Sequence, residues 1–303
     1  MKIVNVDLEK GNHPPSFIAL GNFDGLHKGH IALINKVVSA AKEKNMKSSV
    51  LIFSQHTKNV IFGGKQILLT SKNQKYELLE KSGIDIIYEM DFNLAVMEMK
   101  PLDFFHKLLC KNLNIKGIVV GYDYKFGYRA GGDTTLLKSL TDENNIWFSI
   151  VPPVLSNGES VSSTKIRNFI RDGYIQKANN YLGHPFTIRG EVIHGKKLGT
   201  KMGFPTANIK MEDNYVVPKF GVYDTDIIID GKRYRAATSV GTNPTLEEVG
   251  IKIEAHILDF DKMIYGKTVD LEFLRFIREE LTFSSIETLF EQIKKDREIV
   301  EKR

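Results

Sequence analysis

The first 183 residues alternate short apolar runs with segments of helical periodicity. The clearest apolar runs cover residues 49–53, 84–88 and 115–121. A helical spacing of apolar residues follows residue 30, at Ile31, Ile34, Val37, Val38 and Ala41. Strands that alternate with amphipathic helices are typical of βαβ units, in which helices cover a parallel sheet. We therefore predict a doubly wound α/β domain for this half of the chain.

The pattern changes after residue 183. From His184 to about Phe276, short strand-like runs are separated by turn signals, among them the Asp230–Gly231 pair in "IIIDGKRY" and the segment "SVGTNPT" (239–245). Helical periodicity returns only in residues 285–303. Short strands with regular turn signals favour a small antiparallel β-barrel or sandwich, here closed by a C-terminal helix.

The segment "NNYLGHPF" (179–186) marks the expected boundary between the two halves. A helix is expected to end at Gly183, and Pro185 prevents its continuation. A chain of 303 residues is long enough for two ordinary domains. We predict one domain over residues 1–182 and a second over 183–303.

Composition adds three expectations. The 42 basic residues are scattered among 37 acidic ones, so the net charge of +5 suits small anionic ligands and predicts no nucleic-acid partner. The single cysteine, Cys110, excludes an intramolecular disulfide and fits a reducing compartment. Without a signal peptide or an apolar run of membrane-spanning length, we expect a cytoplasmic protein with no membrane partner. The oligomeric state stays open.

The string "GNFDGLHKGH" (21–30) joins the apolar run 17–20 to the first predicted helix. A helix N-terminus offers unpaired N–H groups and a positive dipole, which together hold phosphate well. Glycines in the string allow a sharp turn and a close approach of a ligand. The candidate phosphate-handling residues are Asn22, Gly25, His27 and His30. Two histidines at a helix end could instead be a cap or surface residues.

A second glycine-rich segment, "GKKLGTKMGFPTANI" (195–209), follows a strand-like run. Its glycines and lysines suit the phosphates of a nucleotide, with Gly195, Gly199 and Gly203 as the candidate contacts. Thr206 and Asn208 place two oxygen-bearing side chains on one face of an extended run, which suits Mg²⁺. The alternative is a glycine-rich surface loop followed by an edge strand.

The first string contains His27-Lys28-Gly29-His30, which resembles the HxGH signature of nucleotidyltransferases. The whole string resembles that of the prokaryotic bifunctional riboflavin kinase/FMN adenylyltransferases, also called FAD synthetases. "VVGYDYKFG" (119–127) and "SSTKIR" (162–167) resemble two further motifs of that family, in the same order. The resemblance implies a Rossmann-type nucleotidyltransferase domain that joins FMN to the AMP part of ATP and releases pyrophosphate. It implies that His27 and His30 act on ATP phosphates, that Ser163, Thr164 and Arg167 bind ATP, and that Asp123 and Phe126 bind flavin.

The residues of "SSTKIR" also support a ligand without the family. Ser162 or Ser163 is a suitable N-cap for a helix that we expect to run through Tyr181. Lys165 and Arg167 lie in the first turn of that helix, where positive charge opposes the helix dipole. An anion bound at this point explains them better than helix stability does, although both could be solvated surface charges.

The second half resembles riboflavin kinases over "PTAN" (205–208), "FGVY" (220–223), "SVGTNPT", "IEAHILDF" (253–260) and "LEFLRFIREELTF" (271–283). The resemblance implies a riboflavin kinase-like barrel in which Thr206 and Asn208 bind Mg²⁺ and ATP phosphate, and Glu254 activates the riboflavin 5′-hydroxyl. Period-two alternation agrees, because it separates Glu254 and His256 from the apolar face of their strand. Arg278 is a candidate flavin contact, with a surface salt bridge as the alternative.

Two departures from the family concern the adenylyltransferase half. Gln55 and Thr57 stand where the family carries prolines, and Arg129 is displaced by one position. We predict an enzyme that phosphorylates riboflavin to FMN and adenylylates FMN to FAD, with ATP and Mg²⁺. The departures leave open a riboflavin kinase with an inactive first domain, and a flavin or nucleotide sensor is a further alternative. An adenylyltransferase for another acceptor would leave the second half unexplained.

Overall fold

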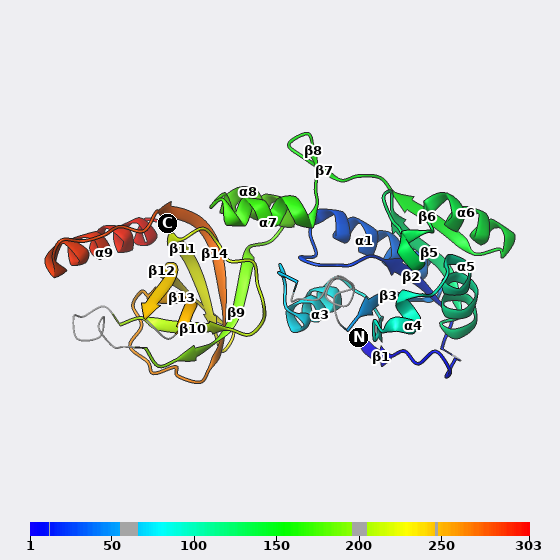
Figure 1. The fold of residues 1–303 in the computed structure, drawn as a ribbon, viewed down its shortest axis with the longest axis horizontal. Helices are drawn as coiled ribbons and strands as arrows, with labels where there is room; N and C mark the ends of the chain where they lie inside the picture. The colour runs from blue at the N-terminus through cyan, green and yellow to red at the C-terminus, as the bar shows by residue number, and fades with distance from the viewer. Residues whose placement is uncertain (12, 55–65, 196–204, 246–247) are drawn as a thin grey trace. The chain divides into compact units, whose positions relative to one another are not determined.

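The computed structural model describes residues 1–11, 13–54, 66–195, 205–245 and 248–303. The chain divides into two compact units. The first contains Met1–Gln66 and Lys72–Val161, and the second contains Ile67–Ser71 and Ser162–Arg303. Figure 1 shows a sheet with helices in the first unit and a barrel with helices in the second.

A six-stranded parallel sheet forms the centre of the first unit, with the strand order β1-β4-β3-β2-β5-β6. The strands are β1 (Lys2–Asn5), β2 (Ser16–Leu20), β3 (Lys47–Phe53), β4 (Ile86–Met90), β5 (Ile115–Gly121) and β6 (Trp147–Val151). The strand order reverses at β2, which lies between β3 and β5. In open α/β sheets, ligands bind beyond the carboxyl ends of the strands at such a switch point. The predicted α/β fold is confirmed.

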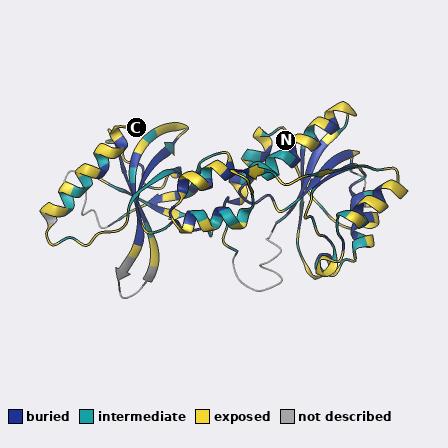
Figure 2. Cartoon of the chain, turned by 90° about the horizontal axis from the view of Figure 1, so that it is seen from above, coloured by how far each residue is buried: buried dark blue, intermediate teal, exposed yellow. Residues whose placement is uncertain are grey.

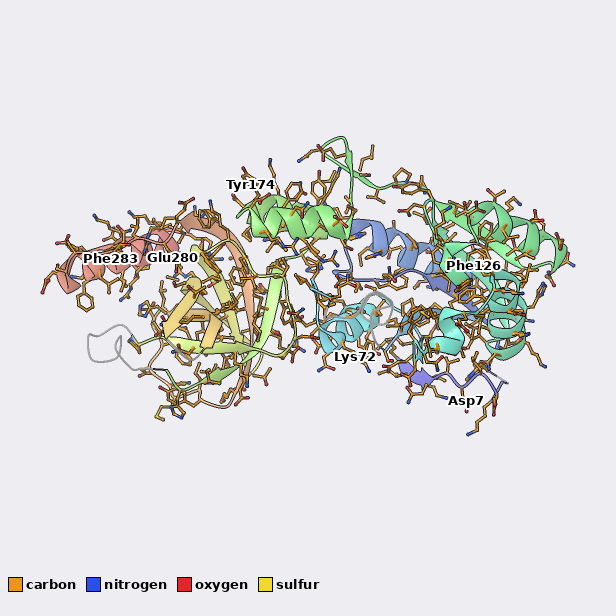
Figure 3. All side chains as sticks on the ribbon, viewed as in Figure 1. Asp7, Lys72, Phe126, Tyr174, Glu280 and Phe283 are labelled. Atoms are coloured by element: carbon orange, nitrogen blue, oxygen red, sulfur yellow. The ribbon has the colours of Figure 1, made fainter. Side chains whose placement is uncertain are left out.

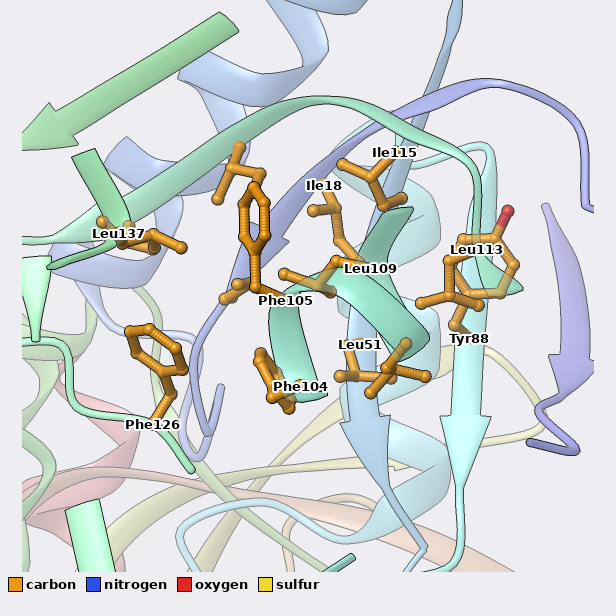
Figure 4. Close-up of a cluster of buried hydrophobic side chains, with 14 of the residues drawn as sticks. Ile18, Leu51, Tyr88, Phe104, Phe105, Leu109, Leu113, Ile115, Phe126 and Leu137 are labelled. Atoms are coloured by element: carbon orange, nitrogen blue, oxygen red, sulfur yellow. The ribbon is translucent and has the colours of Figure 1, made fainter. Parts of the chain in front are cut away.

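Both faces of this sheet are covered, which explains why β2 is apolar at nearly every position. Ile18 and Leu20 pack on one face against a π-helix, Phe104–Asn112, whose Phe105 and Leu109 are fully buried (Figure 4). The remaining helical segments of the unit are α1 (Lys28–Glu43), α3 (Lys72–Lys81), α4 (Leu94–Met97), α5 (Pro101–Asp103), a 3-10 turn (Tyr128–Ala130) and α6 (Thr134–Glu143). The apolar stripe of α1 packs on the other face. Its predicted members Ile34, Val37 and Ala41 are buried.

A closed antiparallel barrel with the strand order β10-β13-β12-β11-β14-β9 forms the centre of the second unit. Its strands are β9 (Phe186–Ile193), β10 (Ala207–Met211), β11 (Gly221–Ile229), β12 (Lys232–Thr245), β13 (Glu248–Ile257) and β14 (Thr268–Arg278). Asp230 and Gly231 both have positive φ in the two-residue hairpin between β11 and β12, as predicted. The C-terminal helix α9 (Ile286–Glu301) starts at a capping box on Ser285. The predicted barrel with its C-terminal helix is confirmed.

The structure contradicts two of the local predictions and confirms a third. The helix predicted from residue 162 or 163 through Tyr181 is wrong, because Gly173, with φ +83°, separates α7 (Ser163–Arg171) from α8 (Ile175–Leu182). The turn expected in 239–245 is also wrong, because these residues belong to β12. Residues 241–245 pair with β13 alone, so Pro244 interrupts no second ladder. The helix end expected at Gly183 is confirmed, because α8 ends with Gly183 as its left-handed C-cap residue.

The helices of both units expose one face, whereas the central strands are mostly buried (Figure 2). A short hairpin of β7 (Leu155–Ser156) and β8 (Glu159–Ser160) precedes α7. Both α7 and α8 belong to the second compact unit, whose longer segment starts at Ser162. The domain boundary predicted between residues 182 and 183 stays a prediction. Among the described residues, no helix combines the length and apolar character needed to cross a membrane.

Candidate active sites

The two histidines of the first string form one structural unit at the start of α1. His27 is the N-cap residue, and its Nδ1 accepts a hydrogen bond from the backbone N–H of His30 at 3.3 Å. The two rings stack with their centroids 3.7 Å apart. A Cβ on Gly29 would lie 3.1 Å from two ring atoms of His27, so a side chain at position 29 would push this ring away. The spacing His-x-Gly-His therefore has a steric reason.

The hydrogen bond and the burial decide which ring atoms can bind a phosphate. Because Nδ1 of His27 accepts a hydrogen bond, the neutral ring carries its proton on Nε2, where it can donate to a ligand. Burial lowers the pKa of His30 well below its usual 6.5, and His27 and Lys75 lower it further. His30 is therefore neutral at pH 7. Its Nδ1 is buried and has no hydrogen-bond partner among the described residues.

The turn before these histidines has an unusual backbone. Phe23 and Leu26 have positive φ angles of 48° and 37°, and Gly25 has a φ of 82°. Non-glycine residues adopt this region at a cost, which here is offset by complete burial of the Phe23 and Leu26 side chains. Asn22 is exposed at the carboxyl end of β2, and Gly25 is buried. The turn is thus a fixed element of the structure next to the switch point.

The candidate flavin residues lie after β5, the strand beside β2. Leu20 of β2 is paired with Val120 of β5, so the segments that follow both strands leave the same edge of the sheet. Asp123 is exposed there. Phe126 is buried in the core, 5.5 Å from the ring of Phe104 (Figures 3 and 4). The flavin contact of Asp123 and that of Phe126 both stay predictions.

The segment that departs from the family motif, around Arg129, has an unusual backbone. Arg129 and Ala130 both have positive φ, at 52° and 56°, and Arg129 lies over the ring of Tyr128. Asp133, at the end of the same segment, accepts hydrogen bonds from the backbone N–H groups of Thr135 and Leu136 at 3.0 Å. These bonds, above all that from Leu136, lower the pKa of Asp133. Asp133 therefore caps α6, a role that the sequence analysis missed.

The residues of "SSTKIR" start α7 in the second unit. Ser162 is the N-cap residue, and its hydroxyl accepts from the backbone N–H of Lys165. Ser163 and Thr164 occupy the first turn. Arg167 donates from Nε to the carbonyl of Ile67 at 2.9 Å. The ATP contacts of Ser163, Thr164 and Arg167 stay predictions, as do the roles of Gly199, Gly203, Gln55 and Thr57, which lie outside the described residues.

The barrel brings two candidate residues together that are 46 positions apart in the sequence. Asn208 of β10 lies directly opposite Glu254 of β13 in the antiparallel ladder. Their neighbours Ala207 and Ala255 are also paired, and both are buried. Because side chains alternate along a strand, Asn208 and Glu254 share the opposite, outer face of the barrel wall. Side chains of directly opposite residues are within contact distance.

Two neighbours fix the orientation of this pair. A Cβ on Gly195 would lie 2.7 Å from Cγ of Asn208, so the amide occupies the space that a side chain at position 195 would need. Lys252, two residues before Glu254, places its Nζ 2.8 Å from Oε2 of Glu254. Lys252 was not among the predicted site residues, although the period-two alternation that supports Glu254 also puts Lys252 on that face.

The candidate metal residues carry oxygen ligands of the kind that Mg²⁺ takes. Among the described residues, no group of three or more His, Cys, Asp or Glu side chains could hold a metal ion. Thr206, just before β10, offers a hydroxyl, and Asn208 in β10 offers an amide oxygen. Mg²⁺ commonly takes few protein ligands and completes its coordination with substrate phosphates and water. The residues present therefore fit a magnesium–ATP complex.

Arg278, the last residue of β14, forms the salt bridge that the sequence left open as an alternative. Its Nε and Nη2 donate to the carboxylate of Asp296 on α9, at 3.0 and 2.7 Å. Asp296 is only 4% exposed and also accepts from Gln292. The pair ties α9 to the end of β14, across the segment that carries Glu280 and Phe283 (Figure 3). A flavin contact of Arg278 stays a prediction.

Two family models match different parts of the chain. Residues 9–165 match the family model described as FAD synthetase, and residues 182–303 match that of riboflavin kinase. The chain is 36% identical to the bifunctional riboflavin kinase/FMN adenylyltransferase of Listeria monocytogenes, over 92% of this chain and 89% of the relative. The chain belongs to the bifunctional riboflavin kinase/FMN adenylyltransferase family. The relative of that name from Bacillus subtilis is 32% identical, over 96% of this chain and 93% of its own.

A solved structure shares the fold of this family member. The crystal structure of a macrolide-efflux protein from Streptococcus pneumoniae matches with a TM-score of 0.91 at 31% identity, and the match covers 99% of this chain and 98% of the other. Both catalytic domains of the family are present in the chain, which favours a bifunctional enzyme over a riboflavin kinase alone and over a sensor.

Proposed function

We propose that the two activities of this family are carried by separate groups of residues. The outer face at Asn208 and Glu254 phosphorylates riboflavin to FMN, and the turn at His27 and His30 adenylylates FMN to FAD. The single observation that supports the kinase assignment best is the register that pairs Asn208 with Glu254. An amide that binds the nucleotide and a carboxylate base can act in the same reaction only if they are adjacent. The β10–β13 pairing places Asn208 next to Glu254.

Glu254 acts as the general base of the kinase. The 5′-oxygen of riboflavin attacks the γ-phosphorus of ATP, the bond from that phosphorus to the β–γ bridging oxygen breaks, and ADP leaves. The hydroxyl proton passes to the carboxylate of Glu254. Lys252 holds one carboxylate oxygen, Oε2, which leaves Oε1 to accept the proton.

Thr206 and Asn208 bind the magnesium–ATP complex through their side-chain oxygens. The metal would supply charge stabilisation on the ATP phosphates. Asn208 is held for this task by the space above Gly195. Gly195 thus acts by leaving room for Asn208, beside any contact of its own with a phosphate.

The adenylyl transfer requires no covalent nucleophile from the protein. A phosphate oxygen of FMN attacks the α-phosphorus of ATP, the α–β bridging bond breaks, and pyrophosphate leaves. Nε2–H of His27, the neutral ring of His30 and the first N–H groups of α1 bind the phosphate oxygens, on which negative charge develops. We expect both reactions to take place in the cytoplasm, where their substrate ATP is available.

A crossed variant experiment tests the assignment. The full chain is incubated with ATP and Mg²⁺, once with riboflavin and once with FMN, and the flavins are separated by chromatography. We expect Glu254→Gln to slow FMN formation by about 10²- to 10⁴-fold and to leave FAD formation from FMN intact. The double variant His27→Ala/His30→Ala should show the reverse pattern.

Each arm has a control for folding and an outcome that would contradict it. Riboflavin binding by Glu254→Gln reports an intact barrel, and the fluorescence of Trp147, the single tryptophan, reports the first unit. Near-normal FMN formation by Glu254→Gln would remove Glu254 from the role of base. FAD formation that survives the double histidine change would remove the histidines, and absence of FAD from the unmutated chain would mean an inactive first domain.

A further inference from the structure

His256 connects the strand of the proposed base to the segment of the proposed nucleotide ligands. It lies on β13, two residues after Glu254, and is only 8% exposed. Its Nδ1 is 3.0 Å from the carbonyl oxygen of Pro205. Pro205 directly precedes Thr206, so the bond joins the two parts of the kinase site from opposite strands.

The chemistry of the two partners fixes the direction of this hydrogen bond. A carbonyl oxygen can only accept, so Nδ1 of His256 carries the proton and donates it. The bond lies just before the first paired residues of β10 and β13, Ala207 and Ala255. Residues 205 and 206 come before the first paired residue of β10. The His256 bond extends the attachment to β13 by two residues.

We propose that His256 is a positioning residue of the kinase. Its Nδ1–H holds the carbonyl of Pro205 and so sets the distance of Thr206 from Glu254. The inference rests on the proposed roles of Thr206 and Glu254. In this arrangement one strand, β13, presents the base and also locates the segment that binds the nucleotide.

Two near-isosteric variants separate positioning from simple packing. In His256→Asn the amide nitrogen lies one bond beyond Cγ, at the place of Nδ1, and can still donate to Pro205. In His256→Gln the amide nitrogen lies one bond further from the backbone and cannot replace that donor. Both variants keep a polar planar side chain, so the pair differs mainly in the position of the N–H group.

The readouts are steady-state riboflavin phosphorylation at varied ATP and Mg²⁺, with riboflavin binding followed by flavin fluorescence. We expect His256→Gln to lower kcat/KM for magnesium–ATP by about 10- to 100-fold, the range for groups that orient a metal ligand, while riboflavin affinity is retained. His256→Asn should keep most of the kcat/KM. FAD formation from FMN should be unchanged in both variants.

The remaining outcomes overturn the inference. Equal activity of the two variants, whether both are active or both inactive, would show that the position of the donor does not matter. A parallel loss of riboflavin affinity in His256→Gln would show a general collapse of the barrel face. The Glu254→Gln variant, assayed alongside, separates failure of the proposed kinase site from failure of the positioning role. If Glu254→Gln stays active, the proposed site fails; an inactive Glu254→Gln with an active His256→Gln refutes only the positioning role.

Discussion

The amide of Asn208 occupies the space that a side chain on Gly195 would need. A Cβ built on Gly195 would lie 2.7 Å from Cγ and 3.0 Å from Oδ1 of Asn208, and closer still to Nδ2. Cβ atoms essentially never lie closer than 3.0 Å to a non-bonded heavy atom, so one of the two residues would have to move. Gly195 has no positive φ, so its requirement for glycine comes from this close approach and not from the backbone conformation.

We predict that Gly195→Ala lowers riboflavin phosphorylation because the new methyl group displaces the amide of Asn208 from its place opposite Glu254. FAD formation from FMN should be unaffected. Gly250→Ala is the matched control, because Gly250 lies in β13 and a Cβ there would meet nothing within 4 Å. The measurement is kcat/KM for magnesium–ATP. Equal activity of the two variants would mean that Asn208 needs no such space.

The sequence suggested which residues form the kinase site, but not how the fold brings them together. The resemblance to riboflavin kinases pointed to Glu254, and period-two alternation within its strand agreed. The short polar run after Pro205 pointed to Asn208. That the two residues are opposite each other depends on the register between β10 and β13. No local pattern encodes a register between strands more than 40 residues apart, so this pairing required the fold.

The same limit explains the residues whose surroundings differ from the expectation. Phe126 was selected from a motif, and its ring is buried against Phe104 of the π-helix. For Arg278 the sequence left a ligand contact and a salt bridge open, and the structure shows a salt bridge to Asp296, 18 residues further along the chain. Gly173 breaks a helix whose apolar periodicity continues on both sides of it. In each case the missing information was a tertiary contact or a backbone angle.

The pair of Arg278 and Asp296 should contribute strongly to the stability of the second unit. Asp296→Asn leaves the largely buried guanidinium of Arg278 without its carboxylate. Breaking a buried ion pair in this way costs about 3–5 kcal/mol. Glu298→Gln is the control on the same helix, because Glu298 and Lys302 are exposed and such pairs contribute about 0–1 kcal/mol. Thermal unfolding of both variants measures the difference. Similar unfolding temperatures would show that α9 is held in place by other contacts.

The stability of the first unit should fall as the pH drops below about 6.5, the usual pKa of histidine. Burial lowers the pKa of His30 in the folded state, so the unfolded chain binds the proton more readily. Stability is therefore full above pH 6.5 and is lost as the pH falls toward the lowered pKa of the folded state. Urea unfolding followed by Trp147 fluorescence at pH 7.5 and 5.5 measures this loss. His30→Asn should reduce the pH dependence, and an unchanged slope in that variant would assign it to other groups.

The extent of the kinase fragment that folds alone depends on α8. Asn179 of α8 donates to the carbonyl of Phe273 and accepts from the backbone N–H of Phe186, both at 2.8 Å. Ala178, Tyr181 and Leu182 are nearly fully buried. A fragment that starts at residue 183, the predicted boundary, would expose the surface these residues cover and leave two strand groups without their partner.

We therefore expect the fragment 162–303 to fold and to phosphorylate riboflavin, and the fragment 183–303 to be less stable, with a lower unfolding temperature. Asn179→Ala in the longer fragment separates the two contributions. It should cost about 1 kcal/mol for each lost hydrogen bond, whereas removal of the whole of α8 also removes its buried apolar side chains. Circular dichroism during heating measures all three proteins. Equal unfolding temperatures of the two fragments would place the folding boundary at residue 183 and make α8 dispensable for the barrel.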